Sequence, residues 1–520
     1  MIGHLATVLA SRRAVPAALA LAAISSVVVP SVGEAAARVP VVTASQPLQP
    51  AFDPGIRDYS VTCESGPVTF TAVSPFGVAV QFGSGRSKGG TLKQQLTLSP
   101  GQRVVMTVRQ VYAGRTLSFR TYSVRCRPAD LPMPVITRTP GAKLSGVRYL
   151  TVPRLKTVTP QSRMYLVMYD SNGTPVWWRS TGNSDSVFAT MVGPRTMAHF
   201  ESTLGQPFQG SGRGRWVFRT LGGRVTNILE PAGITFDHHE ILGTPDGTWL
   251  TMSYEPRAGV DLTSVSGPAS ALAVDAVVRE VSNAGQVLWT WNSKDHIALA
   301  EGGTVRVSTI FDGAGGLFGP GGGNAYDLAH INSIEPDGDG YLISLRRPSA
   351  VYRILKSTGE VDWKLGGTTT AKSLAVIGDP NGSLPLVGQH DARRLPDGSI
   401  SVYDNGVKGG QPQVRPPRVV RYRVDPAART ATFISEITDP AAATSPCCGS
   451  ATRLKGGNWL ISWGGIPRLT EVDSRGRLML AIDFPADAIQ RSYRVAAVDP
   501  RVVPRDEILL GMDRMVASGR

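Results

Sequence analysis

The 520-residue sequence predicts an all-β protein, and two features predict this class: its composition and its internal repeats. Hydrophobic residues make up 42% of the chain and charged residues only 18%, whereas coiled coils and helical solenoids need charge-rich sequence. The 57 glycines and 38 prolines fit many short strands joined by tight turns. The apolar content is high enough to fill a core, so wholesale disorder is excluded.

The formal net charge is +14, which suits a nucleic acid, an anionic surface or an anionic small molecule. The basic residues lie in short clusters, such as those at 211–216 and 415–423. The sequence has no zinc-finger, helix-turn-helix or RNA-recognition signature. We therefore expect no nucleic-acid partner, and an ordinary basic surface or an anionic ligand remains.

The first 37 residues have the pattern of a secretory signal peptide. Arg12 and Arg13 precede the apolar stretch 14–32, and the alanines at 35–37 provide small residues for cleavage. This pattern predicts a secreted or cell-envelope protein without stable membrane insertion. The export route, general secretory or twin-arginine, stays open, and an uncleaved membrane anchor is the alternative reading.

Residues 41–133 are expected to form a small N-terminal β-sandwich. The segments 68–72 and 78–82 alternate apolar and polar residues, as half-buried strands do. Cys63 and Cys126 each end a strand-like run, so in an exported protein we expect them to form a disulfide. The segment carries no cluster of acids, bases or ligands, which favours a structural role.

From residue 135 to residue 520 the chain repeats itself. One unit is an apolar strand, a turn centred on Pro-Asp-Gly and a returning strand. The second unit is a hairpin turn with Gly, followed by a strand that often carries Trp. The equivalent turn positions 336, 396 and 455 are 60 and 59 residues apart. Two hairpins make one four-stranded blade, and roughly 380 residues at about 62 per blade predict a six-bladed β-propeller.

Three of the seven histidines share one position in this repeat. His239, His330 and His390 each lie six residues before the Pro of a Pro-Asp-Gly turn. Equivalent positions on the innermost strands of a propeller lie at one height around the axis, so we expect these imidazoles to converge. Folding each hairpin back on itself places three further side chains at that height, namely Arg346, Asn405 and Glu255.

Histidines that converge can bind a metal ion or do chemistry on an anion. Arg346 argues against a metal, because a permanently charged guanidinium repels a cation. A site with His and Arg instead suits a phosphoryl or sulfuryl group. Arg346 and Asn332 would bind its oxygens, and a histidine would act as nucleophile or as general acid and base.

Longer motifs surround these residues: Asp327-x-x-His330-x-Asn332-Ser333, Leu342-Ile-Ser344-x-Arg346, Trp363-x-Leu365-Gly-Gly367, Gln389-His390-Asp391, Tyr403-Asp-Asn-Gly406 and His238-His239-Glu240. Together these motifs resemble those of the bacterial arylsulfotransferases. The resemblance covers residues 135–500, and a small sandwich before the propeller is also common in that family.

The resemblance implies transfer of a sulfuryl group from an aryl sulfate to a phenolic acceptor, with no bound cofactor or metal and without the nucleotide donor PAPS. It implies that His390 is the nucleophile and forms a sulfohistidine. His239, His330 and Arg346 would stabilise the transition state, while Asn332, His238 and Asn405 would help to bind substrate.

Cys447 and Cys448 are adjacent and precede the last repeat turn, so we expect them near the same channel mouth, either as a vicinal disulfide or as a reactive thiol pair. Adjacent cysteines also occur in quinone-dependent propeller dehydrogenases. A metal- or quinone-dependent oxidoreductase therefore remains as an alternative function. A further alternative is a non-catalytic propeller that binds an aromatic anion or a glycan. The sequence leaves the oligomeric state open.

Overall fold

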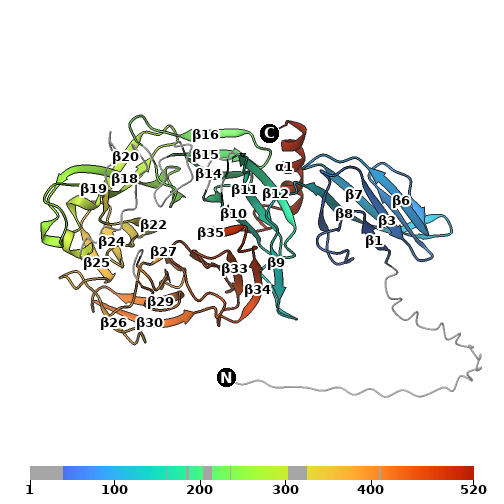
Figure 1. Cartoon of the computed structure of the whole chain (residues 1–520). Helices are drawn as coiled ribbons and strands as arrows, with labels where there is room; N and C mark the ends of the chain where they lie inside the picture. The colour runs from blue at the N-terminus through green and yellow to red at the C-terminus, as the bar shows by residue number, and fades with distance from the viewer. Residues whose placement is uncertain are drawn as a thin grey trace, which may run out of the picture.

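The computed structural model describes residues 39–157, 159, 161–182, 187–202, 214–234, 236–302, 325–408 and 412–519. The expected signal peptide, 1–37, lies outside this part of the chain. The described residues form 35 β-strands, three short 3₁₀ turns (Thr263–Val265, Ser293–Asp295 and Leu299–Gly302) and one α-helix, α1 (Arg505–Ala517). Figure 1 shows a ring of sheets with a smaller unit beside it. The predicted all-β class is confirmed.

Two sheets form the smaller N-terminal unit. One sheet is β1 (Val41–Ala44), β3 (Val68–Val73) and β6 (Thr91–Leu96); the other, in spatial order, is β2 (Asp58–Thr62), β8 (Arg115–Arg127), β7 (Arg103–Tyr112), β4 (Val78–Phe82) and β5 (Lys88–Gly89). Strands β3 and β4 alternate buried and partly exposed residues, and Phe70 and Val80 are fully buried between the sheets. A disulfide joins Cys63 to Cys126, as expected, and so ties the end of β2 to β8.

The turn spacing predicts six blades, and the rest of the described residues contain six mainly antiparallel sheets. The first three are β10 (Arg148–Leu155), β11 (Met164–Tyr169) and β12 (Pro175–Gly182) with β35 (Ile489–Val498); β13 (Ala189–Met191), β14 (Thr196–Ser202), β15 (Gly214–Thr220) and β16 (Val225–Leu229); and β17 (Ile241–Gly243), β18 (Trp249–Val260), β19 (Ala271–Val281) and β20 (Val287–Asn292) with β21 (Ala325–Asp327).

The other three follow in chain order. They are β22 (Ile331–Asp337), β23 (Gly340–Leu345), β24 (Ala350–Leu355) and β25 (Val361–Gly366); β27 (His390–Arg394), β28 (Ile400–Asp404), β29 (Arg418–Asp425) and β30 (Thr430–Ile437) with β26 (Ala375–Ile377); and β31 (Ser450–Arg453), β32 (Trp459–Ser462), β33 (Arg468–Val472) and β34 (Leu478–Asp483) with β9 (Val135–Arg138).

Both ends of the repeat region tie the ring together. The C-terminal strand β35 pairs with β10 of the first sheet and lies near the middle of the ring (Figure 1). The early strand β9 pairs with β34 of the last sheet. In the other sheets the first strand, such as β22, β27 or β31, takes the inner place, so the inner strands of neighbouring sheets run side by side. These strands position the site described below.

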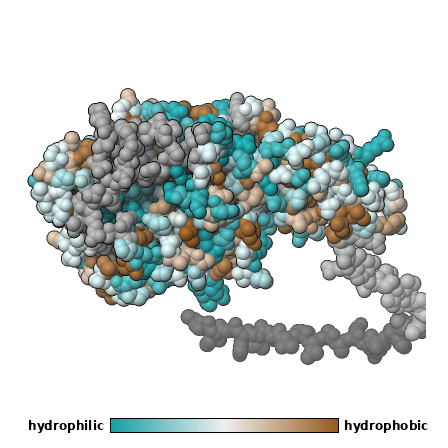
Figure 2. All heavy atoms as spheres, viewed as in Figure 1, coloured by the Kyte–Doolittle hydropathy of each residue, from teal (hydrophilic) through white to brown (hydrophobic). Residues whose placement is uncertain are grey.

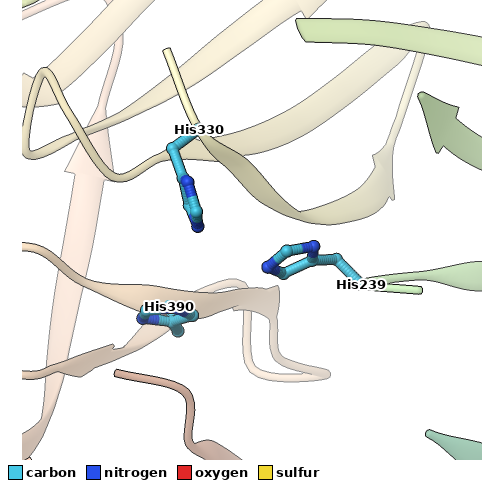
Figure 3. Close-up of side chains that lie close together, drawn as sticks. All are labelled: His239, His330 and His390. Carbon is cyan, nitrogen blue, oxygen red and sulfur yellow. The ribbon is translucent and has the colours of Figure 1, made fainter. Parts of the chain in front are cut away.

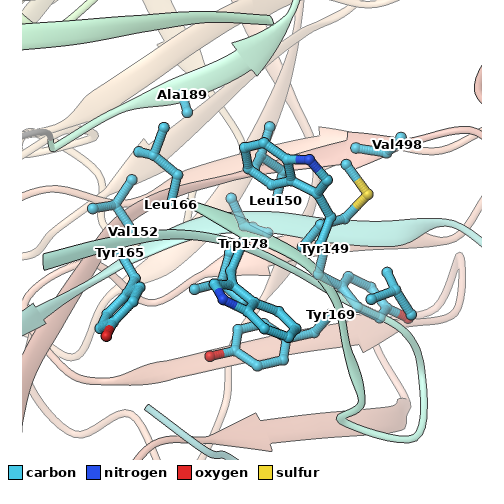
Figure 4. Packing of buried hydrophobic residues seen from close by; sticks show 14 of the residues in the cluster. Tyr149, Leu150, Val152, Tyr165, Leu166, Tyr169, Trp178, Ala189 and Val498 are labelled. Atoms are coloured by element: carbon cyan, nitrogen blue, oxygen red, sulfur yellow. The ribbon is translucent and has the colours of Figure 1, made fainter. Parts of the chain in front are cut away.

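The core lies between neighbouring sheets. Every residue of β11 is buried, because other parts of the ring cover both of its faces. Around it Tyr149, Leu166 and Trp178 pack together, and Val498 of β35 joins the same cluster (Figure 4). Full burial of such a side chain stabilises a fold by about 1.5–3 kcal/mol. The sheets therefore hold one another in place through apolar contacts.

Helix α1 joins the small unit to the ring, and the sequence reasoning did not predict it. Asp513 accepts from Arg103 at 2.5 Å and lies 2.9 Å from Arg125, while Arg505 pairs with Asp58 at 2.6 Å. Met512 packs into the ring's first core cluster. Among the described helical segments, none has the length and apolar character needed to cross a bilayer.

Candidate active site

Three histidines meet where the inner strands of three neighbouring sheets begin. His390 is the first residue of β27, His330 directly precedes β22, and His239 lies two residues before β17. One ring nitrogen from each lies within 4.8 Å of those of the other two. Figure 3 shows His239 and His330 pointing into a shared space, with His390 beside it. All three side chains are buried. The convergence that the repeat spacing predicted is therefore present in the structure.

His390 is held in one tautomer. Its Nδ1 lies 2.7 Å from Oδ1 of Asn405. The Asn405 amide nitrogen donates to the carbonyl oxygens of Ser445 and Cys448, each at 3.0 Å, which fixes its oxygen toward the imidazole. Nδ1 of His390 must therefore carry the proton. Its Nε2 keeps a lone pair, which accepts the backbone N–H of Cys448 at 3.2 Å.

His239 and His330 are each anchored by a buried carboxylate. Nδ1 of His330 lies 2.8 Å from Asp327, and Nδ1 of His239 contacts Asp237. Against the effect of burial, which raises it, His330 and Arg347 lower the pKa of Asp327 to about 2, and His238 and His239 likewise lower the pKa of Asp237, so both carboxyls are ionised. Each carboxylate orients a ring so that Nε2 faces the shared space.

Burial keeps the three imidazoles neutral at pH 7. It lowers the pKa of His239 and of His330 to about 4, because loss of hydration outweighs the nearby carboxylate. The pKa of His390 is well below its usual value, first through burial and then through the charge of Arg346. Three unprotonated Nε2 atoms therefore line the shared space.

Arg346 supplies the positive charge of the site. Its backbone N–H donates to the carbonyl of His330 at 2.9 Å, which places the two residues opposite each other as predicted. Its guanidinium donates to the carbonyl of Pro446 at 2.6 Å. Burial and Arg347 lower its pKa to about 10, so it stays charged at pH 7. In the described part of the chain no carboxylate forms an ion pair with it, and its buried Nε has no hydrogen-bond partner.

The loop 445–448 contacts both the histidine and the arginine. Cys447 and Cys448 form a disulfide at this loop, one of the two alternatives left by the sequence. Cys448 has a φ of 68°, and His330 and Asp391 also have positive φ, at 52° and 54°. Residues other than glycine rarely adopt this left-handed backbone, and such residues gather at functional sites. No feature of the sequence indicated that the Cys448 N–H would reach His390.

The remaining predicted residues lie at or behind the cluster. Asn332 is fully buried and donates to the carbonyl of Gln389 at 2.8 Å, so it supports the backbone next to His390. His238 lies behind His239, with ring centroids 4.0 Å apart. Glu255, expected at the height of His239, forms an ion pair with Arg279 instead. In the β17–β18 register Thr251 lies opposite Ile241, so Glu255 lies two residues beyond the position opposite His239.

Two tyrosines flank the cluster, and the sequence reasoning missed both because they lie outside the repeat pattern. The ring of Tyr493 lies 5.5 Å from that of His239, and the ring of Tyr254 lies 5.8 Å from that of His330. The Tyr254 hydroxyl donates to the carbonyl of Ile331. Burial raises the pKa of both phenols, so both stay protonated.

The chain is distantly similar to several solved structures. They include a protein of unknown function from Bacteroides caccae, with 13% identity over 68% of this chain and 99% of that one and a TM-score of 0.39. The propeller of Dos1 has 11% identity over 68% and 75%, with a TM-score of 0.29. Streptogramin B lyase has 8% identity over 68% and 88%, with a TM-score of 0.33. These scores are too low to carry an argument about function.

No curated protein matches the chain. A family model does match it: the model described as arylsulfotransferase (ASST) covers residues 225–485. That range is half of the chain and contains the three convergent histidines, Arg346, Asn405 and the loop 445–448. The chain belongs to the arylsulfotransferase (ASST) family.

Proposed function

We propose that this protein transfers a sulfuryl group from an aryl sulfate ester to a phenolic acceptor through a sulfohistidine at His390. The observation that carries the proposal is the hydrogen bond of Nδ1 to Asn405, at 2.7 Å, on an imidazole that burial keeps neutral. A nucleophile needs an unprotonated lone pair at neutral pH, and Nε2 of His390 provides it. Membership of the arylsulfotransferase family supports the reaction class.

In the first half of the reaction Nε2 of His390 attacks sulfur. The N–S bond forms as the bond from sulfur to the aryl oxygen breaks, and a phenoxide leaves with that electron pair. The imidazole becomes cationic, and Asn405 Oδ1 accepts from its Nδ1–H throughout. The Cys448 N–H, which bonds to the lone pair in this structure, must give up that bond to the incoming sulfur.

Arg346 is placed to compensate the charge on the sulfuryl oxygens. It has a buried N–H without a partner in the described part of the chain. A preorganised donor of this kind stabilises a transition state without first paying to reorganise water. The neighbouring imidazoles cannot donate while neutral, because their single protons face Asp237 and Asp327.

His239 and His330 therefore suit proton transfer better than binding of the sulfuryl oxygens. In the second half of the reaction the phenolic acceptor attacks sulfur and the N–S bond breaks. One of these two Nε2 atoms accepts the phenolic proton, and the carboxylate behind the ring stabilises the imidazolium. That proton is then released to solvent, from which the departed phenoxide takes up its proton, so the ring returns to its neutral form and atoms and charge balance over the cycle.

Export is part of the proposal. The pattern at residues 1–37 supports a signal peptide, and two disulfides, Cys63–Cys126 and Cys447–Cys448, suit an oxidising compartment. The donor and acceptor are proposed by class only, as a phenyl sulfate ester and a phenol.

The test is a transfer assay with p-nitrophenyl sulfate as donor and phenol as acceptor. We expect parallel lines in double-reciprocal plots, because the donor product leaves before the acceptor binds. His390→Ala should abolish turnover, whereas His296→Ala, a change outside the cluster, should leave it intact. Unchanged transfer by His390→Ala would refute the assignment, and tight binding of the ester without turnover by the wild type would favour the non-catalytic alternative.

A divalent transition metal is a second candidate, favoured by the convergence of three imidazole nitrogens within 4.8 Å. Each ring has an acceptor behind Nδ1, as ligating histidines usually have. The charge of Arg346 opposes it. Titration calorimetry with Zn²⁺ distinguishes the two: stoichiometric tight binding lost in His330→Ala supports a metal site, and turnover that survives chelation supports sulfuryl transfer without one.

A further inference from the structure

Positive charge is dense in one stretch of the small N-terminal unit. Residues 65–129 contain nine Lys and Arg and no Asp or Glu, and the whole unit, 41–133, has ten basic and four acidic residues, a net charge of +6. The nine are Arg86, Lys88, Lys93, Arg103, Arg109, Arg115, Arg120, Arg125 and Arg127. A domain with this charge attracts an anionic partner, and the attraction is independent of the site in the ring.

The structure separates these cations into two groups. Four make contacts within the molecule: Arg103 and Arg125 pair with Asp513 of helix α1, Arg127 donates to Gln49, and Arg109 donates to Gln81. The other five side chains are exposed, and no carboxylate of the described residues forms an ion pair with them: Arg86, Lys88, Lys93, Arg115 and Arg120.

The exposed cations accompany exposed apolar side chains on one hairpin. All ten residues of the segment 112–121, here called the hairpin tip, are exposed. A strand that covers a core on one face alternates buried and exposed residues, so the hairpin tip projects beyond the two-sheet body. Tyr112, Leu117 and Phe119 on it are 71%, 70% and 69% exposed.

The strand register explains why the hairpin tip is uncovered. Strand β2 pairs with β8 only from Ser123 to Arg127, so the first half of β8 is a sheet edge. Across the hairpin, Arg115 lies opposite Tyr112 and Phe119 opposite Arg109, so cations and apolar rings are interleaved. Figure 2 shows hydrophobic and hydrophilic side chains mixed on this unit, where it extends away from the ring.

We propose that the hairpin tip docks the protein on an anionic lipid bilayer. Large apolar side chains on a projecting element bury into the boundary between headgroups and acyl chains, and neighbouring Lys and Arg bind the anionic headgroups. A soluble polyanion explains the cations but not three large apolar side chains in water. A second copy of the chain would bring the same positive charge to the contact, which opposes a symmetric dimer there.

The experiment is co-sedimentation of the full chain with vesicles of phosphatidylcholine alone or mixed with phosphatidylglycerol. We expect binding to the mixed vesicles only, weakened by added salt. Arg115→Ser with Arg120→Ser should weaken it roughly thirtyfold, since each cation near such a surface contributes about 1 kcal/mol. Leu117→Ser with Phe119→Ser should weaken it about tenfold or more.

The matched control is Leu288→Ser with Leu384→Ser, which removes two ring residues of 50% and 53% exposure and should bind like the wild type. Circular dichroism checks that each variant is folded. Three results would overturn the proposal: equal binding to both vesicle types; loss of binding in the arginine variant with none in the Leu117/Phe119 variant, which marks an anionic polymer site; or a wild-type dimer that the Leu117/Phe119 variant converts to a monomer.

Discussion

At the residue scale, the site depends on where single protons sit. Asn405 and its two backbone acceptors place the proton of His390 on Nδ1, and burial keeps the ring neutral. The two other histidines have the same protonated nitrogen for a different reason, since buried carboxylates lie behind them. The residue types alone do not fix these tautomers; the hydrogen-bond partners do.

Asn405→Leu should lower kcat by about 10³-fold, because the imidazole loses the partner that selects its productive tautomer. KM for the donor should change little, since Asn405 bonds to Nδ1 of His390 and not to the nitrogen that attacks. Steady-state kinetics measure both constants, and Asn227→Leu on the surface serves as the control. A rise in KM for the donor with kcat unchanged would mean that Asn405 does not select the tautomer of His390.

Arg346→Met should lower kcat/KM by about 10²–10³-fold through loss of charge at the sulfuryl oxygens. Arg346→Lys should restore only part of it, because an ammonium on a flexible stem does not reproduce a planar guanidinium that already donates to Pro446. The exposed Arg423→Met is the control. Full activity of Arg346→Lys would show that charge alone suffices.

At the element scale, the contacts of the loop 445–448 are the part of the site that the sequence could not predict, although it placed Cys447 and Cys448 near the channel mouth. The six-residue spacing from His to Pro predicted which strand starts converge, because register along a strand follows from counting. A loop has no such period. The contact of the Cys448 N–H with His390 depends on a left-handed backbone at Cys448 and on the Asn405 bonds that hold it.

The two disulfides should therefore have separable effects. Cys447→Ser with Cys448→Ser should lower kcat about tenfold or more with little change in Tm, because the loop positions His390 and Arg346. Cys63→Ser with Cys126→Ser should lower stability by about 4 kcal/mol, since that bond closes a long loop, and leave kcat unchanged. Kinetics and thermal unfolding of both variants decide; the reverse pattern would contradict the assignment.

At the scale of the whole molecule, the all-β class and the repeat region followed from the sequence, because Gly-Pro punctuation and repeat spacing are local signals. Helix α1 was not predicted, because Asp513 and Arg505 on it form their ion pairs with residues of the small unit, which are far away in the sequence. The closing partners of β35 and β9 are hundreds of residues away, and no local pattern indicates them.

Burial of histidines makes the stability of the molecule depend on pH. The pKa values of His199, His239 and His330 are lowered to about 4, and those of His238 and His390 are also lowered. Between about pH 6.5 and 4 the unfolded chain binds protons that the folded chain does not, so stability falls as the pH falls. At pH 5 each histidine with a pKa near 4 costs about 2 kcal/mol.

We therefore expect Tm to decrease from pH 7 to pH 5, and to decrease less in His199→Gln, which removes one such group away from the site. Thermal unfolding followed by circular dichroism measures both. A Tm that is constant or rises on acidification would mean that the histidines are charged in the folded state.

Whether His390 carries the sulfuryl group is tested by mass spectrometry of the protein after reaction with an aryl sulfate in the absence of an acceptor. We expect a gain of one SO₃ on the peptide that contains His390, its loss when phenol is added, and no gain in His390→Ala. Labelling of any other residue, or rapid turnover with no labelled protein at any time, would contradict the assignment of His390.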